Sequence, residues 1–176
     1  MEITTLCYIE KDNKYLMLHR IKKKNDINEG KWIAPGGHCE NGESPDDCVQ
    51  REVLEETGLR LKSAKFRGIV TFYSKAIRDE REGLYTEEEK DPWSKDVTDY
   101  MCLFTSDDFE GELADCDEGT LEWVPKNRLS ELNLWKGDLI FLDLISSPEQ
   151  PFFSLKLTYE GDVLTEAILD GVKISL

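Results

Sequence analysis

Hydrophobic positions along the chain fall into short runs rich in β-branched and aromatic residues, separated by charged or glycine-rich turns. Runs of this kind are typical of strands. The first two, residues 3–9 and 15–18, flank a Lys-Asp-Asn-Lys turn, which predicts a hairpin. Further strands are expected over residues 66–73, 99–104, 121–125 and 152–159.

Two segments have the features of helices. Ser44 is suited to cap the first, Pro45 to occupy its first position, and Gly58 to end it, while two acidic residues favour the positive end of the helix dipole. Residues 135–145 have the apolar spacing of a second helix. Strands combined with two helices predict an α/β fold.

Length and charge narrow the classes of function. The 176 residues are enough for one domain, which we expect to span residues 1–176. The chain holds 22 Lys and Arg against 37 Asp and Glu, a formal charge of −15. Polynucleotides and anionic membranes attract clustered basic residues, so neither is an expected partner. An anionic ligand would need something other than net charge to hold it, and a divalent cation is the obvious candidate.

The sequence carries no sign of export. No apolar stretch approaches the roughly 18 residues of a membrane span, and the first residues lack the pattern of a signal peptide. The five cysteines include no C-x-x-C pair, so we expect reduced thiols and a cytoplasmic protein. Both a monomer and a homodimer are compatible with the sequence.

A charged segment over residues 75–96 separates two expected strands. It is long for a hairpin connection, and charged residues dominate it. We favour a solvated loop insertion over a substrate lid, since loops are generally exposed and variable. Tyr85 and Trp93 are the residues that a lid would use.

The chemistry is expected at the first helix. Residues three and four apart share a helix face, so Glu52, Glu55 and Glu56 project together. Such carboxylates repel one another unless a cation gathers them, and hard oxygen ligands suit Mg²⁺, with Mn²⁺ as a second candidate. Arg51 can pair with a carboxylate and hold its rotamer. Taken alone, the three glutamates favour a solvent-facing acidic helix over a metal site.

The spacing around these glutamates decides between the two interpretations. Gly37, Glu43 and the run from Arg51 to Leu59 resemble the Nudix box at every defined position. The resemblance extends to MutT-like pyrophosphatases over residues 16–20, 30–32, 35–37, 117–118, 121–125 and 135–138. It implies the Nudix fold, an α/β/α sandwich with a mixed β-sheet, and Mg²⁺-dependent hydrolysis of nucleoside diphosphates linked to another moiety.

The resemblance also implies roles for individual residues. Glu52, Glu55 and Glu56 match the metal-binding and base-supplying glutamates of the family, and the Gly36 carbonyl matches a further metal ligand. Glu118 matches a distal carboxylate that binds metal or orients water, with an ordinary acidic turn as the alternative. We expect Glu52 to be the general base, with Glu118 as the second candidate.

Base recognition is expected farther along the chain. Trp135 and Asp138 match the residues that stack on a purine and hydrogen-bond its edge, although a tryptophan at a helix start is also a common core anchor. The other candidates for substrate binding are Arg20, Trp32, Ile33 and His38.

Three positions depart from the oxidised-purine branch that the chain most resembles. Ile33 stands where an asparagine often hydrogen-bonds the base, Gly137 replaces one of two aspartates, and His38 replaces a lysine. The loss of polar contacts weakens discrimination between bases. The expected reaction is cleavage of a nucleoside triphosphate such as 8-oxo-dGTP to monophosphate and pyrophosphate. Other substrates, namely ADP-ribose or a dinucleoside polyphosphate, and a catalytically silent nucleotide sensor remain alternatives.

Overall fold

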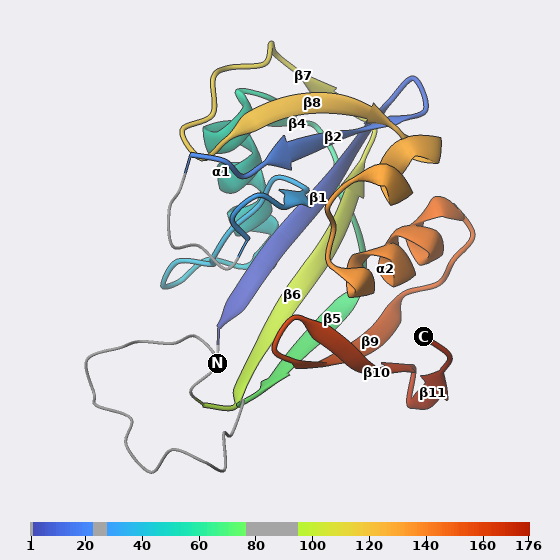
Figure 1. Cartoon of the computed structure of the whole chain (residues 1–176). Helices are drawn as coiled ribbons and strands as arrows, with labels where there is room; N and C mark the ends of the chain where they lie inside the picture. Colours follow the sequence, from blue (N-terminus) through green and yellow to red (C-terminus); the bar gives the residue numbers. More distant parts are fainter. Residues whose placement is uncertain (1, 23–27, 77–94) are drawn as a thin grey trace.

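The computed structural model describes residues 2–22, 28–76 and 95–176 (Figure 1). Most of its regular structure is strand. The elements, in chain order, are β1 (Ile3–Lys11), β2 (Lys14–His19), β3 (Trp32–Ile33), α1 (Pro45–Thr57), β4 (Arg60–Leu61), β5 (Lys65–Lys75), β6 (Val97–Ser106), β7 (Phe109–Glu110), β8 (Thr120–Pro125), the 3₁₀ helix η1 (Lys126–Glu131), α2 (Lys136–Ser146), β9 (Phe153–Glu160), β10 (Val163–Leu169) and β11 (Val172–Ile174).

The main sheet is mixed. Its strand order is β11-β10-β9-β5-β6-β1-β2-β3, and β8 pairs with β2 beside this path. β1 runs parallel to β6, and β5 runs parallel to β9, whereas the remaining pairs are antiparallel. β1 pairs with β6 from Ile3 to Ile9, and its last two residues pair with β2 in the hairpin that the turn sequence predicts.

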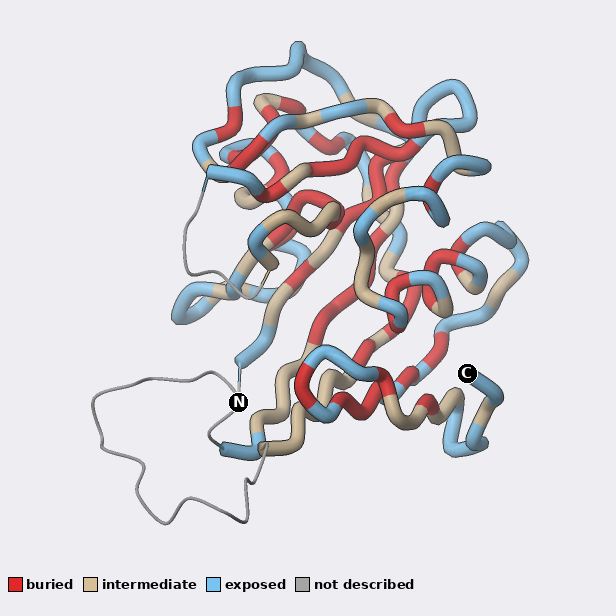
Figure 2. Tube along the Cα trace, viewed as in Figure 1, coloured by how far each residue is buried: buried red, intermediate tan, exposed pale blue. Residues whose placement is uncertain are grey.

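Strand alternation places the two helices on opposite faces of this sheet. Successive side chains of a strand point to opposite faces. In β1, Cys7 and Ile9 pack with α1, whereas Tyr8 between them packs with α2. In Figure 1, α1 and α2 accordingly lie on either side of the central strands, whose buried residues are red in Figure 2. The expected α/β/α sandwich is confirmed.

α1 begins and ends where its sequence predicts. The Ser44 side chain accepts a hydrogen bond from the Asp47 N–H, and the Asp47 carboxylate accepts one from the Ser44 N–H, which completes a capping box. Gly58 ends the helix at a φ of 75°, a left-handed conformation that favours glycine. Val49 and Val53 are fully buried against the sheet, so the opposite side of the helix is free for polar residues.

The second helix and the six expected strands are also present, each within two residues of its predicted ends. The sequence analysis did not predict β10, β11, the short strands β3, β4 and β7, or η1. Most of the charged insertion, with the lid interpretation and its residues Tyr85 and Trp93, lies outside the described residues. No helix in the described part of the chain is long and apolar enough to cross a bilayer.

Candidate active site

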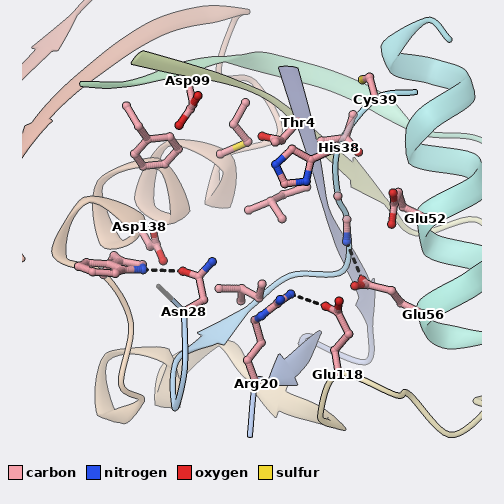
Figure 3. Close-up of a pocket in the computed structure, with 18 of the residues that line it drawn as sticks. Thr4, Arg20, Asn28, His38, Cys39, Glu52, Glu56, Asp99, Glu118 and Asp138 are labelled. Atoms are coloured by element: carbon pink, nitrogen blue, oxygen red, sulfur yellow. Dashed lines mark hydrogen bonds and ion pairs between the residues drawn. The ribbon is translucent and has the colours of Figure 1, made fainter. Parts of the chain in front are cut away.

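A cavity of about 630 Å³ opens between α1, the α2 face of the sheet and the segment that leads into α2 (Figure 3). Figure 3 shows carboxylates on one side of the cavity, from Glu52, Glu56 and Glu118, and a second polar group around Asn28 and Asp138 on the other. Residues far apart in the sequence therefore give the cavity two chemically different ends.

α1 supplies two carboxylates of the acidic end. Glu52 and Glu56 are one helical turn apart and both line the cavity. Glu118, from the turn that precedes β8, lines it as well and forms an ion pair with Arg20. Glu56 is largely buried, and its Oε2 accepts a hydrogen bond of 2.8 Å from the Gly36 N–H.

Burial is the main influence on Glu56. It raises the pKa of this carboxyl to about 8, and the negative charges of Glu118 and Glu52 act in the same direction. The Gly36 N–H and the Arg20 charge oppose the change. Burial and neighbouring carboxylates thus disfavour the charged form of Glu56 unless a cation binds beside it.

Two glycines allow the chain to pass close to these carboxylates. At Gly36 φ is 151°, and a Cβ atom would lie 2.0 Å from the Thr5 carbonyl oxygen. At Gly37 a Cβ atom would lie 2.5 Å from the Glu52 carboxylate. The carbonyls of Pro35 and Gly37 accept hydrogen bonds from β1, whereas no backbone N–H of the described residues bonds to the carbonyl of Gly36. The Gly36 carbonyl therefore remains available as an oxygen ligand.

Arg51 holds the outer carboxylates in place. Its guanidinium bonds to both oxygens of Glu43, at 2.7 and 2.9 Å, and to Glu52 Oε1 at 2.7 Å. Hydrogen bonds from Arg51, together with one from the Glu40 backbone, lower the pKa of Glu43 to about 2. A weaker contact of 3.2 Å joins Arg51 to Glu55. This arrangement fixes the rotamer of Glu52 as the sequence analysis expects.

Glu55 differs from its two neighbours. Its side chain is 61% exposed and does not line the cavity, because it lies on the outer edge of the glutamate face. Within the described ranges, no three His, Cys, Asp or Glu side chains stand close enough to form a ready metal cage. The donors that face one another across the cavity are nevertheless all hard oxygens, which fit Mg²⁺ or Mn²⁺ with water completing the coordination.

The second end of the cavity is aromatic and polar. Trp135 immediately precedes α2, and its indole N–H donates a hydrogen bond of 2.8 Å to Asn28 Oδ1. The Lys31 ammonium lies 4.5 Å from the centre of the Trp135 ring, and Tyr159 packs edge-on against that ring. These contacts give the indole one orientation at the cavity wall.

Asp138 is buried in the first turn of α2. Burial raises the pKa of its carboxyl to about 7, while a hydrogen bond from the Trp135 backbone and the charge of Lys31 oppose that change. Near neutral pH this group is therefore able both to donate and to accept a hydrogen bond.

The other sequence candidates are placed as follows. Ile33, Arg20 and His38 line the cavity. His38 is exposed, and its Nε2 lies 2.9 Å from a Glu2 carboxylate oxygen. Trp32 is not among the lining residues, because its ring stacks on His19 with a centroid separation of 4.5 Å. The assignment of roles to all these residues remains a prediction.

The structure adds lining residues that the sequence analysis did not single out as site residues. They come from strands whose alternate side chains face the cavity, and they include Thr4, Phe72, Ser74, Asp99, Met101 and Tyr159. Strand alternation could have separated Phe72 from Tyr73, which lies on the other face and donates a hydrogen bond to Asp96. Which face of the strand meets a cavity is not written in the local sequence.

Comparison with known proteins agrees with this architecture. A family model described as the NUDIX domain matches residues 2–145. An uncharacterised Nudix hydrolase, YvcI of Bacillus subtilis, is 31% identical over 146 residues, which cover 82% of this chain and 79% of the relative. An oxidized purine nucleoside triphosphate hydrolase of Danio rerio is 27% identical over 152 residues, covering 86% and 85% of the two chains.

Among solved structures, the crystal structure of a MutT protein from Bacillus halodurans superposes with a TM-score of 0.77 and 26% identity, covering 97% of this chain and 98% of that one. The family match, the oxygen-rich end of the cavity and the sandwich fold agree with one another. The chain therefore belongs to the Nudix family, whose hydrolases act on phosphoanhydride bonds of nucleotide derivatives.

Proposed function

We propose that this chain is a Mg²⁺-dependent pyrophosphohydrolase that cleaves a nucleoside triphosphate to a nucleoside monophosphate and pyrophosphate. The observation that carries the proposal is the two-ended cavity: oxygen ligands lie at one end, and Trp135 and Asp138 lie at the other. A nucleotide has the same polarity, with an anionic phosphate chain and a flat, hydrogen-bonding base. Oxidised purine deoxynucleotides such as 8-oxo-dGTP are the first candidates, supported by the relative from Danio rerio.

The residues present fit a divalent cation. Glu52, Glu56 and Glu118, with the Gly36 carbonyl, would hold it at the acidic end, and Glu55 would contribute from the rim. When bound, the cation supplies charge neutralisation at the phosphate oxygens and lowers the pKa of a water ligand. The cation also offsets the negative charge of the protein, because a formal charge of −15 would by itself repel an anionic nucleotide.

Activation of the water and recognition of the nucleobase are assigned to protein residues. We assign the general base to Glu52, since Arg51 bonds to its Oε1 and leaves the second carboxylate oxygen to accept a proton from the attacking water. The attack breaks a phosphoanhydride bond, and pyrophosphate leaves. Glu118, paired with Arg20, is the second candidate for the base. Trp135 would stack on the nucleobase, and Asp138 would bond to its edge.

The test is a hydrolysis panel with identified products. Wild-type protein with Mg²⁺ would be given 8-oxo-dGTP, dGTP, the other deoxynucleoside triphosphates, ADP-ribose and a diadenosine polyphosphate. We expect 8-oxo-dGTP to give the highest kcat/KM with release of pyrophosphate, and Glu56→Gln to lose most of this activity. Highest activity on ADP-ribose or on the dinucleotide would contradict the proposed substrate class, and Mg²⁺-dependent nucleotide binding without turnover would indicate a sensor.

A further inference from the structure

Tyr159 is a buried polar residue of the cavity that the proposed mechanism does not use. It lies near the end of β9, is 4% exposed, and lines the cavity together with Trp135 and Asp138. Its ring meets the Trp135 ring edge-on, with a centroid separation of 5.8 Å and an interplanar angle of 81°. The hydroxyl therefore belongs to the end of the cavity assigned to the nucleobase.

The Tyr159 hydroxyl occupies the space in front of Gly137. A Cβ atom at position 137 would lie 2.6 Å from this oxygen and 2.5 Å from Leu157 Cδ1. Both distances are shorter than real contacts, so a side chain at position 137 would require the Tyr159 hydroxyl and the Leu157 methyl group to shift. Gly137 and Tyr159 thus form a complementary pair. A glycine at position 137 leaves this space to the Tyr159 hydroxyl.

Among the described residues, the Tyr159 hydroxyl has a partner as a hydrogen-bond acceptor but none as a donor. Its oxygen accepts a hydrogen bond of 2.9 Å from the Gly137 N–H. Its own proton has no acceptor among the residues that the structure describes. Burial raises the pKa of Tyr159 well above its ordinary value, so the proton stays on the oxygen. A buried donor without an acceptor is costly, which indicates that something in the cavity accepts this hydrogen bond.

We infer that Tyr159 is a specificity-determining residue whose hydroxyl donates a hydrogen bond to an acceptor atom, a carbonyl oxygen or an unprotonated ring nitrogen, on the nucleobase. The inference rests on the proposed function, because it assumes that a base occupies this end of the cavity. It adds to the proposed function the hydrogen-bonding pattern that the edge of the base must have. The edge presents an acceptor to Tyr159 and a donor or an acceptor to Asp138.

Tyr159→Phe tests this directly, because it removes one oxygen and keeps the ring. Binding of nucleoside monophosphates would be measured by titration calorimetry with Mg²⁺ present. A monophosphate has no phosphoanhydride bond to cleave, so the readout does not depend on turnover. The probes are the four common deoxynucleoside monophosphates, 8-oxo-dGMP and deoxyribose 5-phosphate, which has no base. Tyr73→Phe is the matched control, since Tyr73 is a tyrosine on the opposite face of the same sheet.

We expect Tyr159→Phe to weaken binding of the best monophosphate about tenfold and to leave deoxyribose 5-phosphate unchanged. Tyr73→Phe should match the wild type for every probe. An unchanged affinity for the best monophosphate in Tyr159→Phe would overturn the inference, as would an equal loss for the base-free probe. Wild-type protein that binds all bases equally would overturn it too.

The same experiment separates this inference from the proposed function. If wild-type protein hydrolyses no triphosphate but its base-selective binding is lost in Tyr159→Phe, the role of Tyr159 stands and the proposed reaction fails. If triphosphates are hydrolysed and Tyr159→Phe keeps the same order of substrates, the reaction stands and the role of Tyr159 fails. A second variant tests the complementary pair: Gly137→Ala should lower Tm in the wild type and lower it less in the Tyr159→Phe background.

Discussion

Three glutamates of one helix acquire different properties from their neighbours. Glu52 is held by Arg51, Glu55 is mostly exposed, and Glu56 is buried against the Gly36 N–H. Their chemistry as free side chains is the same, so the differences come from burial and from nearby charges. At the scale of single residues, the sharpest tests of the site therefore change a side chain whose properties depend on one identified neighbour.

The assignment of the general base predicts a selective loss in Glu52→Gln. We expect kcat to fall roughly 10²- to 10⁴-fold, because the amide cannot accept the proton of the attacking water. Mg²⁺ binding, measured by calorimetry, should persist through the other ligands. Glu122→Gln on the exposed face of β8 is the control for loss of one negative charge. Near-normal turnover in Glu52→Gln with intact metal binding would contradict the assignment of Glu52 and favour Glu118 as the general base.

The raised pKa of Asp138 predicts that the stability of the protein depends on pH. Its pKa is about 7 in the folded protein and ordinarily 3.8, so between these values the native state binds a proton that the unfolded chain has lost. Its contribution to the free energy of unfolding therefore decreases as pH rises from about 4 to about 7, by on the order of a few kcal/mol. Asp138→Asn should lose this dependence.

Thermal unfolding between pH 5 and pH 8 checks the prediction for Asp138. The stability of the wild type relative to Asp138→Asn should fall as the pH rises, whereas Asp143→Asn, on the exposed side of α2, should follow the wild type. Parallel curves for the wild type and Asp138→Asn would show that the carboxyl titrates near its ordinary pKa.

At the scale of elements, α1 is the part of the molecule that local sequence describes most fully. Its caps, buried valines and glutamate face are all visible as a spacing pattern, because a helix is built from contacts within four residues. Burial of Val49 and Val53 against the sheet sets the rotation of the helix, and with it where Glu52 and Glu56 project.

Removal of the cap side chain should destabilise the protein modestly. We expect Ser44→Ala to cost about 1 kcal/mol and to lower Tm by roughly 2–4 °C, because the Asp47 N–H loses its acceptor. Ser63→Ala is the matched control, since Ser63 is exposed and its side chain makes no hydrogen bond among the described residues. Equal effects of the two substitutions would show that the capping box contributes nothing beyond the loss of a hydroxyl.

The strands that the sequence analysis did not predict lack the sequence features that usually mark a strand. β3, β4 and β7 have two residues each, and β10 and β11 form an edge with several exposed positions, so neither length nor alternation marks them. They become strands because a partner segment offers backbone donors and acceptors: β2 does this for β3, and β4 and β7 pair with each other. β9 does this for β10, which then pairs with β11.

At the scale of the whole molecule, the charge of −15 and the acidic end of the cavity lead to one expectation about metal. A ligand that binds only the native state stabilises it by mass action. Mg²⁺ at about 100 times its dissociation constant should contribute about 2.7 kcal/mol and raise Tm by roughly 5–10 °C. EDTA should reverse the change without unfolding the protein, because apolar clusters on both faces of the sheet hold the fold independently of metal.

Differential scanning calorimetry across a Mg²⁺ titration measures this stabilisation. Glu56→Gln should lose most of the increase in Tm, whereas Glu122→Gln should keep it. An identical increase in both variants would place the stabilising cation elsewhere on the acidic surface.

The local sequence predicts six of the strands, the two helices and the glutamate spacing, because these depend on residues that are near neighbours along the chain. It also identified most of the residues that line the acidic end, through a resemblance that rests on the same local spacing. The tertiary structure decided that Glu55 stays at the rim, that Trp32 stacks on His19 away from the cavity, and that Tyr159 faces Gly137. These outcomes depend on contacts between different elements of the fold, whose packing in space no local pattern encodes.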